Sequence, residues 1–230
     1  MNKCLVIRLN EAVENTNLKT LFTDYRSKAD FSVVPQYVQL VGTGLPVTQF
    51  KTGECRIEAD FIGINNNTTG FLFTGFLHED NSDKIRLQFK KPYTSGSAGA
   101  STYTVQSAYG SGSPDTGNFS LNKDSEYKLV SQLGVCKIYN SSGSLVGTIN
   151  YTESGNVQID KFYYAVADSS SCKKDMFYMK CIKIIRNQDE KILLSVYPAV
   201  DENNQGCLYD SENECFYYAN TGQLAVSNDE

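Results

Sequence analysis

The sequence has no tryptophan and a single histidine, His78, among its 230 residues. One histidine excludes zinc sites built on two or more histidines and every mechanism that needs a histidine pair. The 21 lysines and arginines are outnumbered by 26 aspartates and glutamates, so there is no basic excess for binding nucleic-acid phosphates. No apolar run approaches the roughly 18 residues of a membrane-spanning helix. We therefore expect no nucleic-acid partner and no membrane insertion.

The seven cysteines include no Cys-x-x-Cys pair, which excludes zinc-ribbon and thioredoxin-like motifs. Seven is an odd number, so at least one cysteine is unpaired within the chain. The apolar stretch Cys4–Ile7 ends at Arg8 and is too short for the hydrophobic region of a signal peptide. We expect folding in a reducing cytoplasm with free thiols, and a disulfide framework is the alternative.

The sequence is rich in short runs of alternating apolar and polar residues separated by Gly, Asn and Ser. Such runs predict β-strands, because successive side chains of a strand point to opposite faces. The predicted strands are residues 3–9, 35–41, 54–62, 70–77, 84–90, 101–109, 126–130, 134–140, 144–149, 157–166, 176–186, 191–197, 206–210 and 214–218. So many short strands with one helix predict an all-β fold, an antiparallel β-sandwich.

One segment departs from this pattern. Leucine and aromatic residues recur at helical spacing between Leu18 and Tyr25, which predicts a short helix. We therefore divide the chain into an N-terminal strand-helix extension, residues 1–33, and a β-sandwich, residues 34–230.

Turn-forming residues predict two hairpins, at Asn140–Gly143 and at Asn187–Glu190. The stretch 92–117 is rich in Gly, Ser and Tyr. It is either one long loop or two loops around a single strand, since residues 103–109 alternate.

Two groups of motifs stand out in the sequence. The opening group is YVQLVGTG at residues 37–44 with CRIEADF at residues 55–61. The closing group is MKCIKI, LLSVYPA, GCLYD, CFYYAN and TG, between residues 179 and 222. The two groups resemble the opening and closing segments of concanavalin A-like, or laminin-G-like, jelly-roll domains. The resemblance covers about residues 33–226 and implies the concanavalin A-like jelly-roll fold.

These domains are common in phage tail and fibre proteins and in surface proteins of gut bacteria. The resemblance implies a non-catalytic structural or adhesion component of a bacteriophage virion, assembled in the host cytoplasm, that faces a cell-surface glycan. Residues 1–33 would bind other virion subunits or a second copy, or would form an extra edge strand of the chain's own sandwich. The alternative is a carbohydrate-binding module on the bacterial cell surface.

Some relatives of this kind are laminarinase-type glycoside hydrolases, which carry acids along one strand as E-x-D-x-x-E or E-x-D-x-E. Glu58 and Asp60 supply the first two acids, about 7 Å apart on one face of a strand, while the third acid is missing. A hydrolase using Glu58 and Asp60 is thus a third hypothesis. We expect no enzyme activity and expect both acids to face solvent, opposite inward Ile57, Ala59 and Phe61.

For glycan binding we select Tyr93, Tyr103 and Tyr109, because tyrosine offers a flat apolar face and a hydroxyl at low entropic cost. The alternative is that Tyr103 and Tyr109 point into the core and Tyr93 is an ordinary loop residue.

No cofactor is expected, and two oxygen-rich loops are candidates for calcium. One contains Glu79, Asp80 and Asp83, and the other is Asp201–Asn204. Calcium takes six to eight oxygen ligands, but neither loop has the spacing of an EF-hand. We expect ordinary solvated loops.

Overall fold

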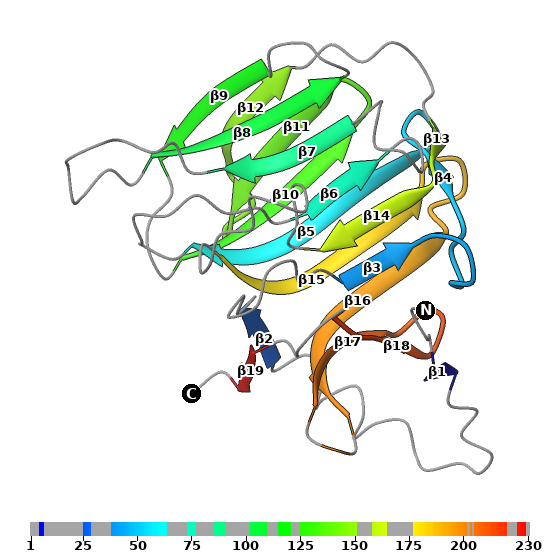
Figure 1. The fold of residues 1–230 in the computed structure, drawn as a ribbon. Coiled ribbons are helices and arrows are strands. Elements are labelled where there is room, and N and C mark those ends of the chain that lie inside the picture. Colours follow the sequence, from blue (N-terminus) through cyan, green and yellow to red (C-terminus); the bar gives the residue numbers. More distant parts are fainter. Residues whose placement is uncertain are drawn as a thin grey trace.

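A computed structural model describes residues 5–6, 25–28, 38–63, 73–76, 85–90, 102–109, 115–120, 125–150, 158–164, 177–201, 203, 205–219 and 225–228. Every regular element in these ranges is a β-strand (Figure 1). Across the same ranges, no helix is long and apolar enough to cross a membrane.

The larger layer is one antiparallel sheet that crosses the whole molecule (Figure 1). Its strands lie in the order β1 (Leu5–Val6), β18 (Cys215–Tyr217), β17 (Gly206–Asp210), β16 (Ile192–Val200), β15 (Phe177–Arg186), β5 (Cys55–Gly63), β10 (Glu126–Gln132), β11 (Val135–Asn140) and β12 (Leu145–Asn150). In addition, β2 (Tyr25–Lys28) pairs with β15, and β19 (Ala225–Asn228) pairs with β2.

The facing layer consists of two three-stranded antiparallel sheets (Figure 1). One contains β3 (Val38–Val41), β14 (Lys161–Tyr164) and β6 (Phe73–Phe76), and the other contains β7 (Ile85–Lys90), β8 (Thr102–Tyr109) and β9 (Asp115–Ser120). A short pair, β4 (Phe50–Lys51) with β13 (Gln158–Ile159), completes the described strands. The fold is therefore the antiparallel β-sandwich that the sequence predicts.

The core lies between the two layers, and alternation along each strand decides which side chains enter it. In β5, Ile57, Ala59 and Phe61 are 4%, 1% and 0% exposed, whereas Glu58 and Asp60 are half-buried on the opposite face. Burying one large apolar side chain contributes about 1.5–3 kcal/mol, so this pattern fixes which face of β5 points outward. The predicted inward and outward sets of this strand are confirmed.

A buried carboxylate holds the last hairpin of the larger sheet. Asp210 is 0% exposed and accepts hydrogen bonds from the backbone amides of Ser195 and Glu212, both at 3.0 Å. Its second oxygen accepts from Asn213 Nδ2 at 2.6 Å and from the Tyr217 hydroxyl at 3.2 Å. Asp210 therefore ties the turn between β17 and β18 to strand β16.

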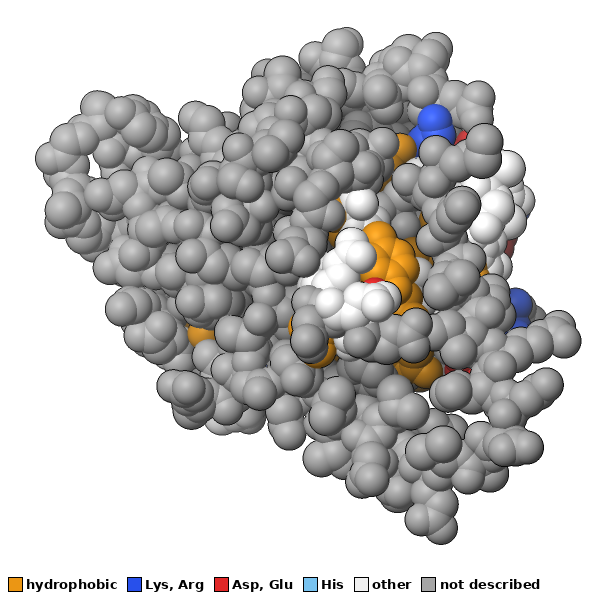
Figure 2. All heavy atoms as spheres, turned by 60° about the horizontal axis from the view of Figure 1, so that its bottom comes forward, with side chains coloured by type: hydrophobic (Ala, Val, Ile, Leu, Met, Phe, Trp, Pro, Cys, Tyr) orange, Lys and Arg blue, Asp and Glu red, His pale blue; other side chains and the backbone are white. Residues whose placement is uncertain are grey.

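A second, smaller apolar cluster lies at the β16–β18 end of the sheet. Its members are Ala199, Cys207 and Phe216, with Tyr197, Tyr209 and Tyr218 packed against them. The rings of Tyr209 and Phe216 have centroids 5.0 Å apart. Figure 2 turns the lower side of the molecule in Figure 1 toward the reader. On this face, apolar side chains of the described residues reach the surface mainly as one central group, beside backbone atoms and polar side chains.

Each predicted strand overlaps an observed strand, and both predicted hairpins are confirmed by the pairing of β11 with β12 and of β15 with β16. Strand β8 lies within residues 92–117 and β9 begins there, so this stretch is not one long loop. The prediction missed β4, β9, β2 and β19. Tyr25, the last position of the predicted helix, lies in strand β2, and residues 18–24 of that helix lie outside the described residues.

Candidate functional site

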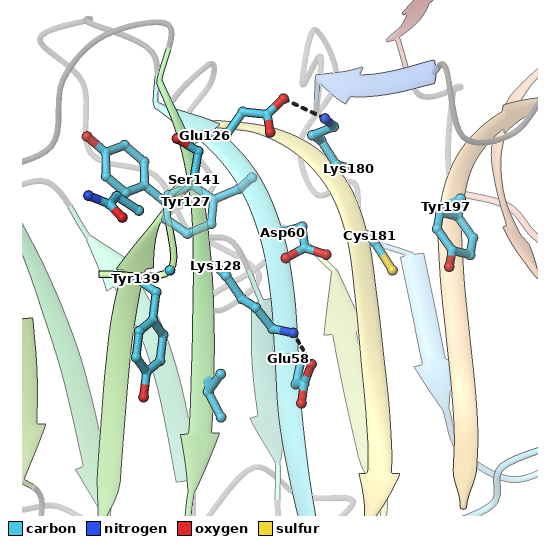
Figure 3. A pocket seen from close by; sticks show the side chains of 14 residues that line it. Glu58, Asp60, Glu126, Tyr127, Lys128, Tyr139, Ser141, Lys180, Cys181 and Tyr197 are labelled. Atoms are coloured by element: carbon cyan, nitrogen blue, oxygen red, sulfur yellow. Dashed lines mark hydrogen bonds and ion pairs between the residues drawn. The ribbon is translucent and has the colours of Figure 1, made fainter. Parts of the chain in front are cut away.

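The outer face of the larger sheet is hollowed by a groove of about 650 Å³ that crosses β11, β10, β5, β15 and β16 (Figure 3). A hollow of this size suits a small organic ligand. The side chains that give the groove its chemistry are Glu58, Asp60, Lys128, Tyr139, Lys180 and Tyr197.

Strand register places several of these side chains in one row across the sheet. Tyr139 lies opposite Lys128, Lys128 opposite Asp60, and Asp60 opposite Cys181. Cys181 is hydrogen-bonded to Tyr197 on the next strand. Neighbouring strands are about 4.8 Å apart, so the row from Tyr139 to Tyr197 spans four inter-strand steps, roughly 19 Å.

Two of the acids in the groove are neutralised by cations. Glu58 accepts hydrogen bonds from Arg56 Nε at 2.8 Å and Lys128 Nζ at 2.6 Å. Burial pushes the pKa of Glu58 upward, but these two cations outweigh burial and hold that pKa below its ordinary value. Glu126 accepts from Lys180 Nζ at 2.6 Å (Figure 3). Both carboxylates are therefore already paired with cations of the protein.

Asp60 differs from these two acids because none of the described residues donates a hydrogen bond to it. Burial raises the pKa of Asp60 above its ordinary value, and the charges of Lys128 and Lys183 offset this only in part. Its carboxylate lies in the middle of the groove between β10 and β15 (Figure 3). An ionised carboxylate is purely an acceptor with two oxygens, so Asp60 is the acceptor that the groove offers to a ligand.

Tyr197 is held in place on the far side of Asp60. Its hydroxyl lies 3.2 Å from Ser195 Oγ and is hydrogen-bonded to Lys183. A tyrosine fixed in this way presents its ring at one end of the row, as Tyr139 does at the other end.

The tyrosines selected from the sequence lie elsewhere. Tyr103 and Tyr109 are on β8 in the facing layer, paired with Phe119 and Ile85. Tyr93 lies outside the described residues, so a role for these three in glycan binding stays a prediction. The structure does bring Glu58 and Asp60 into the groove.

Sequence reasoning missed Tyr139 and Tyr197, although both lie on predicted strands. Alternation within each strand could have assigned these tyrosines to the outer face. It could not have shown that they share one row with Asp60, because that depends on the register of five strands.

The described residues contain no group of three or more His, Cys, Asp and Glu side chains placed to hold a metal ion. In the loop that begins at Asp201, the carboxylate accepts hydrogen bonds from the backbone amides of Asn203 and Gln205 at 2.9 and 2.8 Å, and from the Tyr218 hydroxyl at 3.1 Å. The Asp201 carboxylate therefore stabilises the loop to which it belongs through these hydrogen bonds. The other calcium candidates, Glu79, Asp80 and Asp83, lie outside the described residues.

The cysteines of the described ranges are all buried, with free thiols: Cys55, Cys136, Cys181, Cys207 and Cys215. Burial raises the pKa of Cys181, the one that lines the groove, to about 12. A thiol with this pKa is protonated at neutral pH and is a poor nucleophile.

No protein-family model matches the sequence, and no curated protein is significantly similar to it. The fold is similar to that of a candidate carbohydrate-binding protein from Bacteroides ovatus ATCC 8483, with a TM-score of 0.52 and 9% identity over 89% of this chain. This chain spans 60% of the length of that protein. The heptameric SAP-like pentraxin of Limulus polyphemus matches with a TM-score of 0.45 and 11% identity, over 71% of this chain and 76% of that one. At 9% identity the likeness to the Bacteroides protein shows the fold alone, an antiparallel β-sandwich.

Proposed function

We propose that this protein is a non-catalytic carbohydrate-binding β-sandwich that holds a neutral glycan in its outer-face groove. The observation that carries the proposal is Asp60, a half-buried carboxylate with no donor among the described residues, in a row flanked by Tyr139 and Tyr197. Sugar hydroxyls donate to such a carboxylate, and the C–H faces of a sugar pack on tyrosine rings.

The charges of the groove favour a neutral ligand. Glu58 is paired with Arg56 and Lys128, and Glu126 is paired with Lys180. An anionic sugar would have to displace one of these acids from its cation or face their like charge, and both cost free energy. A neutral sugar displaces neither ion pair, and its hydroxyl groups can donate hydrogen bonds to the Asp60 carboxylate.

The dimensions of the groove favour an oligosaccharide over a single sugar. Its volume is about 650 Å³, and its two tyrosines are separated by four inter-strand steps, roughly 19 Å. A ligand that contacts both rings and Asp60 must therefore extend across the strands.

A glycan array followed by calorimetric titration tests this proposal. We expect binding to one or more neutral oligosaccharides and a loss of about tenfold or more in affinity for Asp60→Asn, since a hydrogen bond to a charged group contributes about 1.5–3 kcal/mol. Glu212→Gln, at an exposed acid in the β17–β18 turn, removes the same charge outside the groove and is the matched control. An array without neutral-glycan binding, or wild-type affinity in Asp60→Asn, would contradict the proposal.

A glycoside hydrolase is the second candidate, because the environments of Glu58 and Asp60 push their pKa values in opposite directions. Divergent pKa values are typical of an acid and nucleophile pair. Glu126, which lies opposite Ile62, adds a third acid to the same groove. Release of reducing ends from β-glucans by the wild type, absent in Glu58→Gln, would establish this candidate and overturn the non-catalytic one.

The finer proposal is an adhesion component of a phage particle, attached through residues 1–33, and it is supported by the sequence resemblance. Strand β1 lies at the end of the larger sheet, where a strand from a neighbouring subunit can add to it. Light scattering on the full chain tests this, since a virion subunit should self-associate. A monomer at every concentration favours the bacterial surface module instead.

A further inference from the structure

The outer face of the β10–β11 hairpin carries a second hollow, with a volume of about 470 Å³. Val130, Leu133 and Val135 give this hairpin hollow apolar walls, while Gln132 and Lys137 supply polar groups. Leu133 is 42% exposed, which is unusual for a large apolar side chain in the described part of the chain. The hairpin hollow is therefore an apolar surface open to a ligand.

The hairpin hollow is continuous with the groove. Val130 and Tyr139 line both. In the register of the sheet, Val130 lies opposite Glu58 of the groove on one side and opposite Lys137 of the hairpin hollow on the other. One ligand can therefore occupy the groove and extend a substituent into the hairpin hollow.

The two hollows differ in chemistry. The groove contains three carboxylates, whereas the lining of the hairpin hollow contains none and has one charged group, Lys137. Within the described ranges, no residue forms a hydrogen bond or an ion pair with the Lys137 ammonium group. A sugar hydroxyl gains little against valine and leucine walls. A short ester gains binding free energy in two ways. Its methyl group is buried against the apolar walls, and its carbonyl oxygen can accept a hydrogen bond from the Lys137 ammonium group.

We propose that the hairpin hollow is a specificity subsite for an O-acetyl group carried by the glycan in the groove. The inference rests on the proposed glycan-binding function and adds the class of substituent that the ligand carries. Acetylated sugars are selected by the apolar contact with Leu133 and Val135, and Lys137 orients the acetyl carbonyl.

The test uses the full chain and a panel of O-acetylated neutral oligosaccharides, each presented before and after mild alkaline de-acetylation. We expect the acetylated form to bind about tenfold more tightly, the sum of one buried methyl group and one hydrogen bond. The double variant Leu133→Ser with Val135→Thr removes the apolar contact and leaves Lys137, so it should reduce this preference to about threefold and keep its affinity for the de-acetylated form. Leu145→Ser, at another exposed leucine, on β12 and outside the hairpin hollow, should keep the preference.

The outcomes separate this inference from the function on which it rests. Equal affinity for both forms, with binding that still depends on Asp60, overturns the acetyl subsite and leaves the proposed function intact. A preference that stays undiminished in the double variant also overturns the subsite. Failure to bind either form of any oligosaccharide overturns the proposed function and the subsite together.

Discussion

Replacing Asp210 by alanine removes the acceptor that ties the last hairpin of the larger sheet to strand β16. Two of its donors, the Ser195 amide and the Tyr217 hydroxyl, belong to residues that are only 3% and 2% exposed. Each buried donor left without an acceptor costs about 1–3 kcal/mol. We therefore expect Asp210→Ala to lower the free energy of unfolding by about 4 kcal/mol, a large share of the about 5–15 kcal/mol of a typical domain.

Asparagine at position 210 keeps the shape of the aspartate side chain and removes its negative charge, so this variant measures the effect of the charge separately. It keeps the oxygen that accepts from the backbone amides of Ser195 and Glu212, but it places an NH₂ group where Asn213 Nδ2 donates at 2.6 Å. Two donors then face each other, and the charge assistance is lost. We expect Asp210→Asn to cost about 2 kcal/mol, between the wild type and the alanine variant.

Asp201 is the matched control for this experiment. Its carboxylate also accepts from two backbone amides of its loop and from a tyrosine hydroxyl, but it is only partly buried, so water can replace it. Asp201→Ala should cost less than about 1 kcal/mol. Urea unfolding followed by far-UV circular dichroism, with a reducing agent for the free thiols, gives the three values. Equal losses in Asp201→Ala and Asp210→Ala would refute the reasoning from buried donors.

Two further predictions concern ionisation and backbone strain. Because the pKa of Asp60 is raised above its ordinary value of about 3.9, glycan affinity should fall as pH decreases through that raised pKa, and titration of Asp60→Asn at several pH values should show no such fall. Glu214 has a φ of 52° in the left-handed region, so Glu214→Gly should raise the free energy of unfolding by about 1 kcal/mol in a urea titration. Glu190, with a φ of 55°, also pairs with Arg56, so Glu190→Gly should gain less than Glu214→Gly, and an equal gain would show that this ion pair contributes nothing.

Much of the fold follows from local pattern. The alternation from Ile57 to Phe61 predicts both the strand and its buried face, because a half-buried strand cannot place these residues otherwise. Turn residues at Asn140–Gly143 and Asn187–Glu190 predict which strands are neighbours. Among the strands that escaped prediction, β4 contains only two residues, and β9 has a polar, glycine-containing sequence.

The candidate site was less predictable, because it is built from long-range register. Tyr139 and Tyr197 are brought into line with Asp60 by strands far apart in the chain. A bulge between Met179 and Cys181 shifts the register of β15 against β5 by one residue. No local pattern encodes such a shift. The sequence analysis therefore predicted binding residues in the tyrosine-rich stretch 92–117, which is conspicuous in composition.

The bulge in β15 also makes the groove open to redesign. Met179 pairs with Phe61 and Cys181 with Asp60, so Lys180 is the extra residue that the ladder between β15 and β5 does not use. Its side chain reaches Glu126 at the end of the groove, and Lys180 is not a member of the hydrophobic core. A library of substitutions at position 180 would therefore vary the charge and shape of the binding surface. The core and the pairing of β15 with β5 would stay the same in every member of the library.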